Sequence, residues 1–318
     1  MIFNKKLIYK IIDNKIDTLE LHNLNKQELN TLYHALNLNH SLKKIDLSDN
    51  YIKDITLLCK SLENNSCLQE LHLSSNQIED ISSLKFLSNY CLEYLSLSGN
   101  KIKDINFLKY LENISYLRIL DLNTNKIKDI TPLKFLLNSC LECLNLDSNQ
   151  IEDISPLKYL ENNNCLQELW LSNNQIKDIS VLKFLSNSCL EELYLNFNQI
   201  EDITSLKFLE NNSCLKVLSL YDNQVKDITS LKYLLNSYLE LLDLSWNQIE
   251  DITSLKFLEN NSCLKYLHLN YNNIKNITSL KFLENNSCLK VLSLSVNPIS
   301  DQDKQKLRKI AELKQINI

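Results

Sequence analysis

The chain has 318 residues, a formal net charge of −5 at pH 7, one Gly and three Pro. Its lysines are dispersed, which argues against a nucleic-acid or anionic-membrane surface, because such surfaces need clustered Lys and Arg on one face. No apolar run reaches the length of about 18 residues that a membrane span requires, and lysines interrupt the apolar N-terminal segment. We therefore expect an intracellular protein with no nucleic-acid or membrane partner. The expected location is the cytoplasm.

One pattern, Leu-x-x-Leu-x-Leu-x-x-Asn-x-Ile, recurs along the chain every 24 to 26 residues. A fixed period of this size indicates a solenoid, in which each strand-plus-helix repeat packs only on its neighbours. We predict a single domain over residues 1–318, with an N-terminal cap over 1–24, repeats over 25–298 and a C-terminal cap over 299–318. The asparagine of the pattern, called the corner asparagine below, is found at Asn50, Asn76, Asn100, Asn125, Asn149, Asn174, Asn198, Asn223, Asn247, Asn272 and Asn297.

The N-terminal segment has the features of a cap. Phe3, Leu7 and Ile11 recur at helical spacing, which predicts a helix over residues 3–13. A first strand is expected over residues 16–21. Leu24 then stands where later repeats have the corner asparagine.

Residues 190–214 represent one repeat. Leucines alternate with other residues at the start of this segment, so we predict a short strand whose leucines enter the core. The outward residues, which would line the concave face, are Glu192, Tyr194 and Asn196. The corner asparagine should turn inward, where its amide can bond to the backbone of neighbouring turns.

A short convex helix is expected after each corner. Thr204 and its equivalents are Thr, Ser or Asn in nearly every repeat, and these residues are typical helix N-caps. Leu206 and Leu209 have the spacing of a buried helix face. Because Gly is almost absent, we expect the asparagines at 211 and 212 to end the helix in the left-handed conformation.

Charged residues alternate in sign between neighbouring repeats. Adjacent strands lie about 4.8 Å apart, so such a column places opposite charges side by side and should help to hold the register. One column runs Glu191, Lys216, Glu240 and Lys265, and another runs Glu152, Lys177, Glu201, Lys226, Glu250 and Lys275.

Eight of the ten cysteines occupy one repeat position, directly before the first strand leucine. Tyr116 and Tyr238 fill this position in two other repeats, as is typical of a packing position, so we predict reduced and buried thiols. Cys140 and Cys143 have CxxC spacing, but no second pair completes a metal site. The eight cysteines are Cys67, Cys91, Cys140, Cys165, Cys189, Cys214, Cys263 and Cys288.

The C-terminal segment should form the second cap. Residues 301–312 have the pattern of a charged amphipathic helix. Leu313, Ile316 and Ile318 are then expected to begin one more strand. Removing this segment would expose the apolar end of the stack.

From Ile16 to the C-terminus the pattern resembles the leucine-rich-repeat superfamily. Most repeats are similar to the short class found in phosphatase-1 regulatory subunits, as in LKVLSLYDNQVKDI at residues 215–228, and the first full repeat, residues 29–50, is similar to the ribonuclease-inhibitor class. The excess of Asn, Ile and Lys resembles repeat proteins of amoebae and their giant viruses, so the expected location is the host cytoplasm if the source is viral. The resemblance implies an α/β solenoid, a leucine-rich-repeat arc with a parallel concave β-sheet and short convex helices, and a protein-binding role.

The concave positions vary while the scaffold is copied. Residues 203–220 and 277–294 are identical, yet the next residues are Tyr221-Asp222 in one copy and Ser295-Val296 in the other. Exposed aromatic residues on a rigid surface are typical of interface hot spots. We therefore predict that a protein partner binds repeats six to ten through Trp170, Tyr194, Phe197, Tyr221, Trp246, Tyr266, His268 and Tyr271, beside an acidic rim of Glu168, Glu192, Asp222 and Asp243.

Three other interpretations remain. The aromatic residues could simply suit β-strands and cover their neighbours, in which case the chain is a structural spacer. The short repeats also leave open a regulatory subunit of a protein phosphatase or a similar enzyme. An enzyme is disfavoured because a chain with one Gly has no Gly-rich phosphate loop. The histidines are also scattered over different repeats, so their spacing assembles no catalytic set; they are His22, His34, His40, His72 and His268. We expect a monomeric, non-enzymatic interaction scaffold with no cofactor and no metal.

Overall fold

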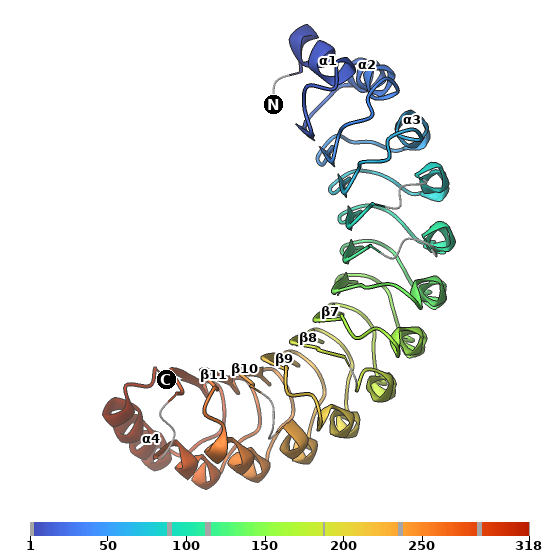
Figure 1. Cartoon of the computed structure of the whole chain (residues 1–318). Coiled ribbons are helices and arrows are strands. Elements are labelled where there is room, and N and C mark those ends of the chain that lie inside the picture. The colour runs from blue at the N-terminus through green and yellow to red at the C-terminus, as the bar shows by residue number, and fades with distance from the viewer. Residues whose placement is uncertain are drawn as a thin grey trace. The chain divides into compact units, whose positions relative to one another are not determined.

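The computed structural model describes residues 3–87, 91–111, 116–186, 188–234, 238–284 and 288–317. The chain divides into two compact units, Met1–Ile151 and Glu152–Ile318. Within each unit the strands lie on the concave side and the helices on the convex side (Figure 1). Each unit is therefore an α/β solenoid, which confirms the predicted fold class. The single domain over residues 1–318 stays a prediction.

The first unit begins with three α-helices among its strands and continues with 3-10 helices, labelled η. Its elements are α1 (Lys5–Ile12), β1 (Thr18–Glu20), α2 (Lys26–Leu36), β2 (Lys44–Asp46), α3 (Thr56–Ser61), β3 (Glu70–His72), η1 (Ser82–Phe86), β4 (Tyr94–Ser96), η2 (Asn106–Tyr110), β5 (Ile119–Asp121), η3 (Thr131–Leu136) and β6 (Cys143–Asn145). The predicted N-terminal helix is confirmed, because α1 buries Leu7 and Ile11. The first strand is shorter than the predicted span of 16–21.

The second unit alternates 3-10 helices with strands and closes with an α-helix. Its elements are η4 (Ser155–Leu160), β7 (Glu168–Trp170), η5 (Ser180–Phe184), β8 (Glu192–Tyr194), η6 (Thr204–Leu209), β9 (Val217–Ser219), η7 (Thr229–Leu234), β10 (Leu241–Asp243), η8 (Thr253–Asn260), β11 (Tyr266–His268), η9 (Thr278–Glu284), β12 (Val291–Ser293) and α4 (Asp301–Lys314). The convex elements of this unit's repeats are thus 3-10 turns, tighter than the α-helices of the first repeats.

Neighbouring strands of the second unit pair in parallel and in one constant register. Leu193 of β8 lies opposite Leu218 of β9, and Leu218 lies opposite Leu242 of β10. Each repeat position therefore faces the same position of the next repeat. The result is a set of columns that cross the sheet, and the properties of a column follow directly from the residues at one repeat position.

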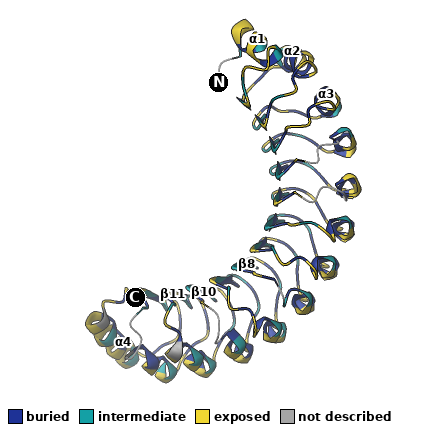
Figure 2. Ribbon diagram, viewed as in Figure 1, coloured by how far each residue is buried: buried dark blue, intermediate teal, exposed yellow. Residues whose placement is uncertain are grey.

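The core of each unit lies between the strands and the convex elements. Leu193 and Leu195 of the strand segment, and Leu206 and Leu209 of η6, are all 0% exposed. Buried residues follow the strands and the inner side of the convex elements, whereas exposed residues lie on the outside (Figure 2). The predicted core positions are therefore confirmed, and replacing one such leucine by Ala should cost about 2–5 kcal/mol.

The corner asparagines form the predicted amide ladder. In Asn198 the Nδ2 atom donates to the carbonyl oxygens of Leu171 at 2.9 Å and Leu195 at 3.1 Å, and Oδ1 accepts from the backbone N–H of Ile176 at 3.0 Å. One amide thus satisfies backbone groups of two repeats in a buried corner, where an unpaired polar group would be costly. At the N-terminal cap, Asn50 Oδ1 accepts from the N–H of Leu24, so the cap residue needs no amide of its own.

The predicted N-cap is wrong by two residues. The 3-10 helix η6 begins at Thr204 itself, and no side chain caps it from the preceding residue. Instead, Asp202 Oδ1 accepts a hydrogen bond from the Thr204 N–H at 2.7 Å. An aspartate two residues earlier closes an Asx turn, which competes successfully with capping by Thr.

The predicted left-handed helix end is also wrong. Asn212 acts through its side chain, with Oδ1 accepting from the N–H groups of Cys214 at 2.8 Å and Leu215 at 2.9 Å. The left-handed conformation occurs instead directly before the corner asparagine. In the second unit the residues with positive φ at this position are Asn173, Phe197, Asp222, Trp246, Tyr271 and Val296.

The cysteine column is not the buried packing position predicted from the sequence. Cys67, Cys91, Cys140 and Cys189 are exposed, and the other four cysteines of the column are of intermediate exposure. Their position lies in the loop that enters the strand, before the first buried leucine. A small residue or a Tyr is tolerated there because the site faces outward. Only Cys59, which belongs to α3 rather than to this column, is buried.

The charge alternation and the C-terminal cap are partly as predicted. Lys216 Nζ lies 2.5 Å from Glu191 Oε2, and Lys265 Nζ lies 2.6 Å from Glu240 Oε2, so this column pairs opposite charges. The amphipathic helix is confirmed as α4, but it extends through Leu313, which is 83% exposed and begins no strand. A single bridge joins Asn317 to Val291. Ile318 lies outside the described residues.

A candidate protein-binding surface on the second unit

Four outward positions of each repeat define the candidate surface. In the repeat of β8 they are Glu192, Tyr194, Asn196 and Phe197, and we call these positions and their equivalents in the second unit the concave columns. The first two lie on the strand. The other two follow it directly, before the corner asparagine turns the chain inward. Because the strands pair in register, residues from neighbouring repeats stack within these columns.

The predicted aromatic residues form three pairs between neighbouring repeats. The ring centroids of Trp170 and Tyr194 are 4.8 Å apart, with the planes tilted at 52°. Phe197 and Tyr221 meet edge to face at 5.0 Å. Trp246 and Tyr271 stack at 4.0 Å with 21° between their planes. The surface is thus a set of paired rings rather than a row of separate side chains.

The pairs differ in how much they expose. Phe197 is 48% exposed, Trp246 44% and Tyr271 42%, so these rings offer area to a partner. Trp170, Tyr194 and Tyr221 are half-buried. The Nε1 atom of Trp170 is covered and has no hydrogen-bond partner among the described residues. The Trp170 and Tyr194 pair therefore contributes more packing and less open surface than the sequence predicted.

Tyr266 and His268 lie on β11, beside the aromatic pairs. Tyr266 is 37% exposed and occupies a column with Val217, Leu241 and Val291, which extends the apolar area along the strand starts. His268 is half-buried, and its Nδ1 atom lies 3.2 Å from Ser293 Oγ. His268 is therefore already engaged with its own sheet.

Backbone strain distinguishes the exposed rings. Phe197, Trp246 and Tyr271 have φ values of 51°, 56° and 53°. This left-handed conformation suits Gly and Asn and costs other residues about 1–2 kcal/mol. The equivalent residues of the first unit are Asn23, Asp49, Ser75, Gly99, Thr124 and Ser148, none of which is a large apolar residue. Bulky rings at this position are not explained by β-propensity, because the position is not on a strand.

The concave columns carry negative charge only. Their charged residues are Glu168, Glu192, Asp222 and Asp243, and no Lys or Arg occurs in these columns. Asp243 Oδ1 accepts a hydrogen bond from the Ser245 N–H at 2.9 Å. Burial raises the pKa of the Tyr221 hydroxyl, and the nearby carboxylates of Asp222 and Asp243 raise it further. A negative potential therefore reaches the middle of the surface.

The described residues offer no metal-binding cluster. No group of three or more His, Cys, Asp or Glu residues that could hold a metal ion occurs within the described ranges. Among those residues, no helix is both long enough and apolar enough to cross a membrane. Of the five histidines, His34 and His40 belong to the first full repeat, and the other three lie elsewhere in the chain.

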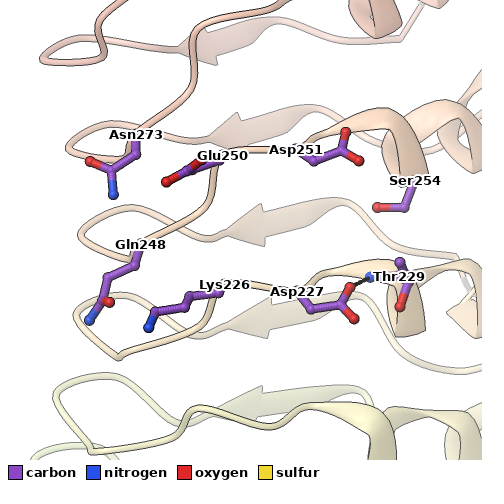
Figure 3. A pocket seen from close by; sticks show the side chains of 8 residues that line it. All are labelled: Lys226, Asp227, Thr229, Gln248, Glu250, Asp251, Ser254 and Asn273. Atoms are coloured by element: carbon purple, nitrogen blue, oxygen red, sulfur yellow. Dashed lines mark hydrogen bonds between the residues drawn. The ribbon is translucent and has the colours of Figure 1, made fainter.

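A depression of about 620 Å³ lies on the side of the second unit, between the turns that lead into η7 and η8. It is lined by polar residues of neighbouring repeats, including Lys226, Asp227, Glu250 and Asp251 (Figure 3). Asp227 Oδ1 accepts a hydrogen bond from the Thr229 N–H at 2.8 Å. A similar depression of about 530 Å³, with Glu79 and Asp80 in its lining, occurs in the first unit. The depression is therefore a product of the repeat and not a specialised site.

Comparisons with known proteins place the chain in a family. The family described as leucine-rich repeats (2 copies) matches residues 40–89, 92–135, 141–187, 166–208 and 190–233, and a second leucine-rich-repeat family matches 235–252 and 260–277. The chain belongs to the leucine-rich-repeat family, whose members commonly mediate protein–protein interactions. No curated protein matches this chain.

Solved structures share the fold. An internalin from Listeria monocytogenes is 29% identical, with a TM-score of 0.72 over 98% of this chain and 87% of the internalin. A leucine-rich-repeat protein from Leptospira interrogans is 22% identical, with a TM-score of 0.65 over 100% of this chain and 99% of that protein. A plant peptide hormone receptor is 17% identical, with a TM-score of 0.50 over 89% of this chain and 54% of the receptor.

Proposed function

We propose that the chain is a non-enzymatic interaction scaffold whose second unit binds a protein partner on the concave columns. The observation that carries this proposal is the placement of Phe197, Trp246 and Tyr271. Each ring is more than two-fifths exposed, and each occupies a backbone conformation that a large side chain adopts only at a cost. Local folding preferences would favour Asn or Gly at these positions. Folding preferences therefore do not explain the aromatic rings at these positions, whereas a role in recognition does.

The proposed mode of binding follows from the rigidity of the sheet. The amide ladder fixes the backbone at the corners that carry the rings, so binding of a partner does not incur the entropic cost of ordering this surface. Large aromatic side chains dominate interface energies, and a few of them can supply most of the affinity. The proposal includes a monomeric scaffold and an intracellular location, both of which rest on the sequence. The structural-spacer interpretation predicts instead that the rings can be removed without loss of any interaction.

Affinity capture from extracts of the source cells tests the proposal. The bait proteins are the wild type, the variant Trp170→Ala/Trp246→Ala and the matched control Tyr238→Ala, which removes a ring that is 61% exposed outside the concave columns. We expect a protein that the wild type and the control retain, and that the double variant loses by a factor of about 30 or more, equivalent to roughly 2 kcal/mol. Equal capture by all three baits would show that the rings belong to the scaffold.

A further inference from the structure

We propose that the partner segment is cationic, and that one of its Arg or Lys side chains binds between the Trp246 indole and the carboxylates of Asp222 and Asp243. This inference rests on the proposed function, because it names the chemistry of the segment that the concave columns bind. It goes beyond that function by predicting which peptides the surface selects and which it rejects.

The charges of the concave columns are complementary to a cation. The concave columns contain four carboxylates and no Lys or Arg, although the whole chain has 34 Lys and Arg residues. The basic residues of the strand region lie in a separate column, where Lys216 and Lys265 are paired with Glu191 and Glu240. Asp222 has no ion-pair partner among the described residues. A cationic partner that binds these carboxylates therefore does not compete with any Lys or Arg side chain of the concave columns.

The exposed stack of Trp246 and Tyr271 has one indole face available to a cation. Asp222, Trp246 and Tyr271 occupy the same position in three successive repeats. Trp246 stacks on Tyr271 at 4.0 Å, so the opposite face of its indole is directed towards the repeat of Asp222. A cation on that face would lie over the π-system and beside a carboxylate. Cation–π contact and ion pairing would then act on the same charge.

The electric field beside the Trp246 stack also favours a cation. The pKa of Tyr221 is raised first by burial and then by Asp222 and Asp243, so both carboxylates act on a group beside the Trp246 stack. A cationic side chain bound there would be favoured by the same field. A carboxylate or phosphate group would be repelled by it.

The convex side of the chain shows what happens to rings that meet their own lysines. Lys207 Nζ lies 5.1 Å from the centroid of Phe208, and Lys232 Nζ lies 5.2 Å from the centroid of Tyr233. Similar pairs recur along the convex 3-10 helices. Trp246 and Tyr271 have no such lysine among the described residues. The convex rings thus make cation–π contacts within the chain, whereas the exposed face of Trp246 is available to a cation of the partner.

The test is selection of displayed peptides on the full-length chain. A library of random dodecapeptides is panned on the wild type at physiological salt, and the selected peptides are synthesised and measured by titration. We expect enrichment of Arg or Lys, and binding that weakens at least tenfold in Asp222→Asn/Asp243→Asn. Asn is favourable in the left-handed conformation of residue 222, and the side-chain oxygen of Asn at residue 243 can still accept from the Ser245 N–H, so this variant should fold. Thermal unfolding checks that it does.

The matched control is Glu201→Gln/Glu250→Gln, which removes the same two charges from exposed positions outside the concave columns. It should bind the selected peptides within about twofold of the wild type. Selected peptides without Arg or Lys that still need Trp246 would overturn the cationic inference and leave the proposed function standing. Cationic peptides that bind the Asp222→Asn/Asp243→Asn variant unchanged would also overturn it. If no selected peptide depended on Trp170 or Trp246, both proposals would fail.

Discussion

The substitution Trp246→Asn separates binding from folding more sharply than truncation to Ala does. Residue 246 has φ of 56°, a conformation that Asn adopts readily, and the indole is 44% exposed. Relief of the backbone strain should contribute about 1 kcal/mol to stability. Loss of the stack on Tyr271 and of the covered part of the ring should cost about 1–2 kcal/mol. The two effects nearly cancel, so the free energy of unfolding should change by about 1 kcal/mol or less.

The measurement is denaturant unfolding of Trp246→Asn beside the wild type and Leu218→Ala. Leu218 is 0% exposed in β9, so its truncation should cost about 2–5 kcal/mol through loss of contacts and a residual cavity. Tyr238→Ala serves as the control for removal of an exposed ring elsewhere. If Trp246→Asn lost as much stability as Leu218→Ala, the indole would be part of the scaffold. The strain argument for a recognition role would then be refuted.

Three further predictions concern the scaffold. Under native conditions a thiol reagent should modify Cys67, Cys91, Cys140 and Cys189, which are exposed, but not Cys59, whose pKa burial raises to about 12; rapid reaction of Cys59 in the folded protein would contradict this. Asp227→Ala should cost about 1 kcal/mol near pH 7 by removing the Asx turn that leads into η7. Hydrogen bonds from Thr229 lower the folded-state pKa of Asp227 below the ordinary value of 3.8, so the stabilisation is fully present above 3.8 and is lost as the pH falls through the lower folded-state pKa; an equal cost at pH 2 and pH 7 in urea titrations would refute the assignment. Deleting residues 299–318 removes Asn317, whose carbonyl accepts from Leu292 N–H, and uncovers the end of the sheet, so we expect a lower midpoint of thermal unfolding and self-association in analytical ultracentrifugation; an equally stable monomer would contradict the capping role.

The sequence predicted the repetitive part of the structure well because each element there depends on one strong local signal. Leu193, Leu206 and Asn198 follow from period and polarity alone, and the structure buries all three. The predicted N-cap was wrong because two polar residues separated by one position, Asp202 and Thr204, can both close a turn. Period cannot decide between them, whereas the hydrogen bond to Asp202 does.

The candidate site was predicted less completely. The alternation of inward and outward positions identified Tyr194 and Tyr266, which lie on strands. It did not identify the left-handed backbones of Phe197, Trp246 and Tyr271. The same repeat position holds Asn, Ser, Thr, Asp or Gly in the other repeats except for Val296, and that preference for small polar residues was the available signal. The pairing of rings between repeats depends on register and side-chain rotation, which a single sequence does not contain.

The most direct test of the binding surface is site-specific photocrosslinking with a benzophenone amino acid at residue 221, compared with the same group at residue 238. Both positions carry a tyrosine, but only Tyr221 lies in the concave columns. We predict a partner adduct at 221 that excess unlabelled wild-type protein abolishes and excess Trp246→Asn protein does not. Equal adducts at 221 and 238, or equal competition by the two unlabelled proteins, would contradict a partner site on the second unit.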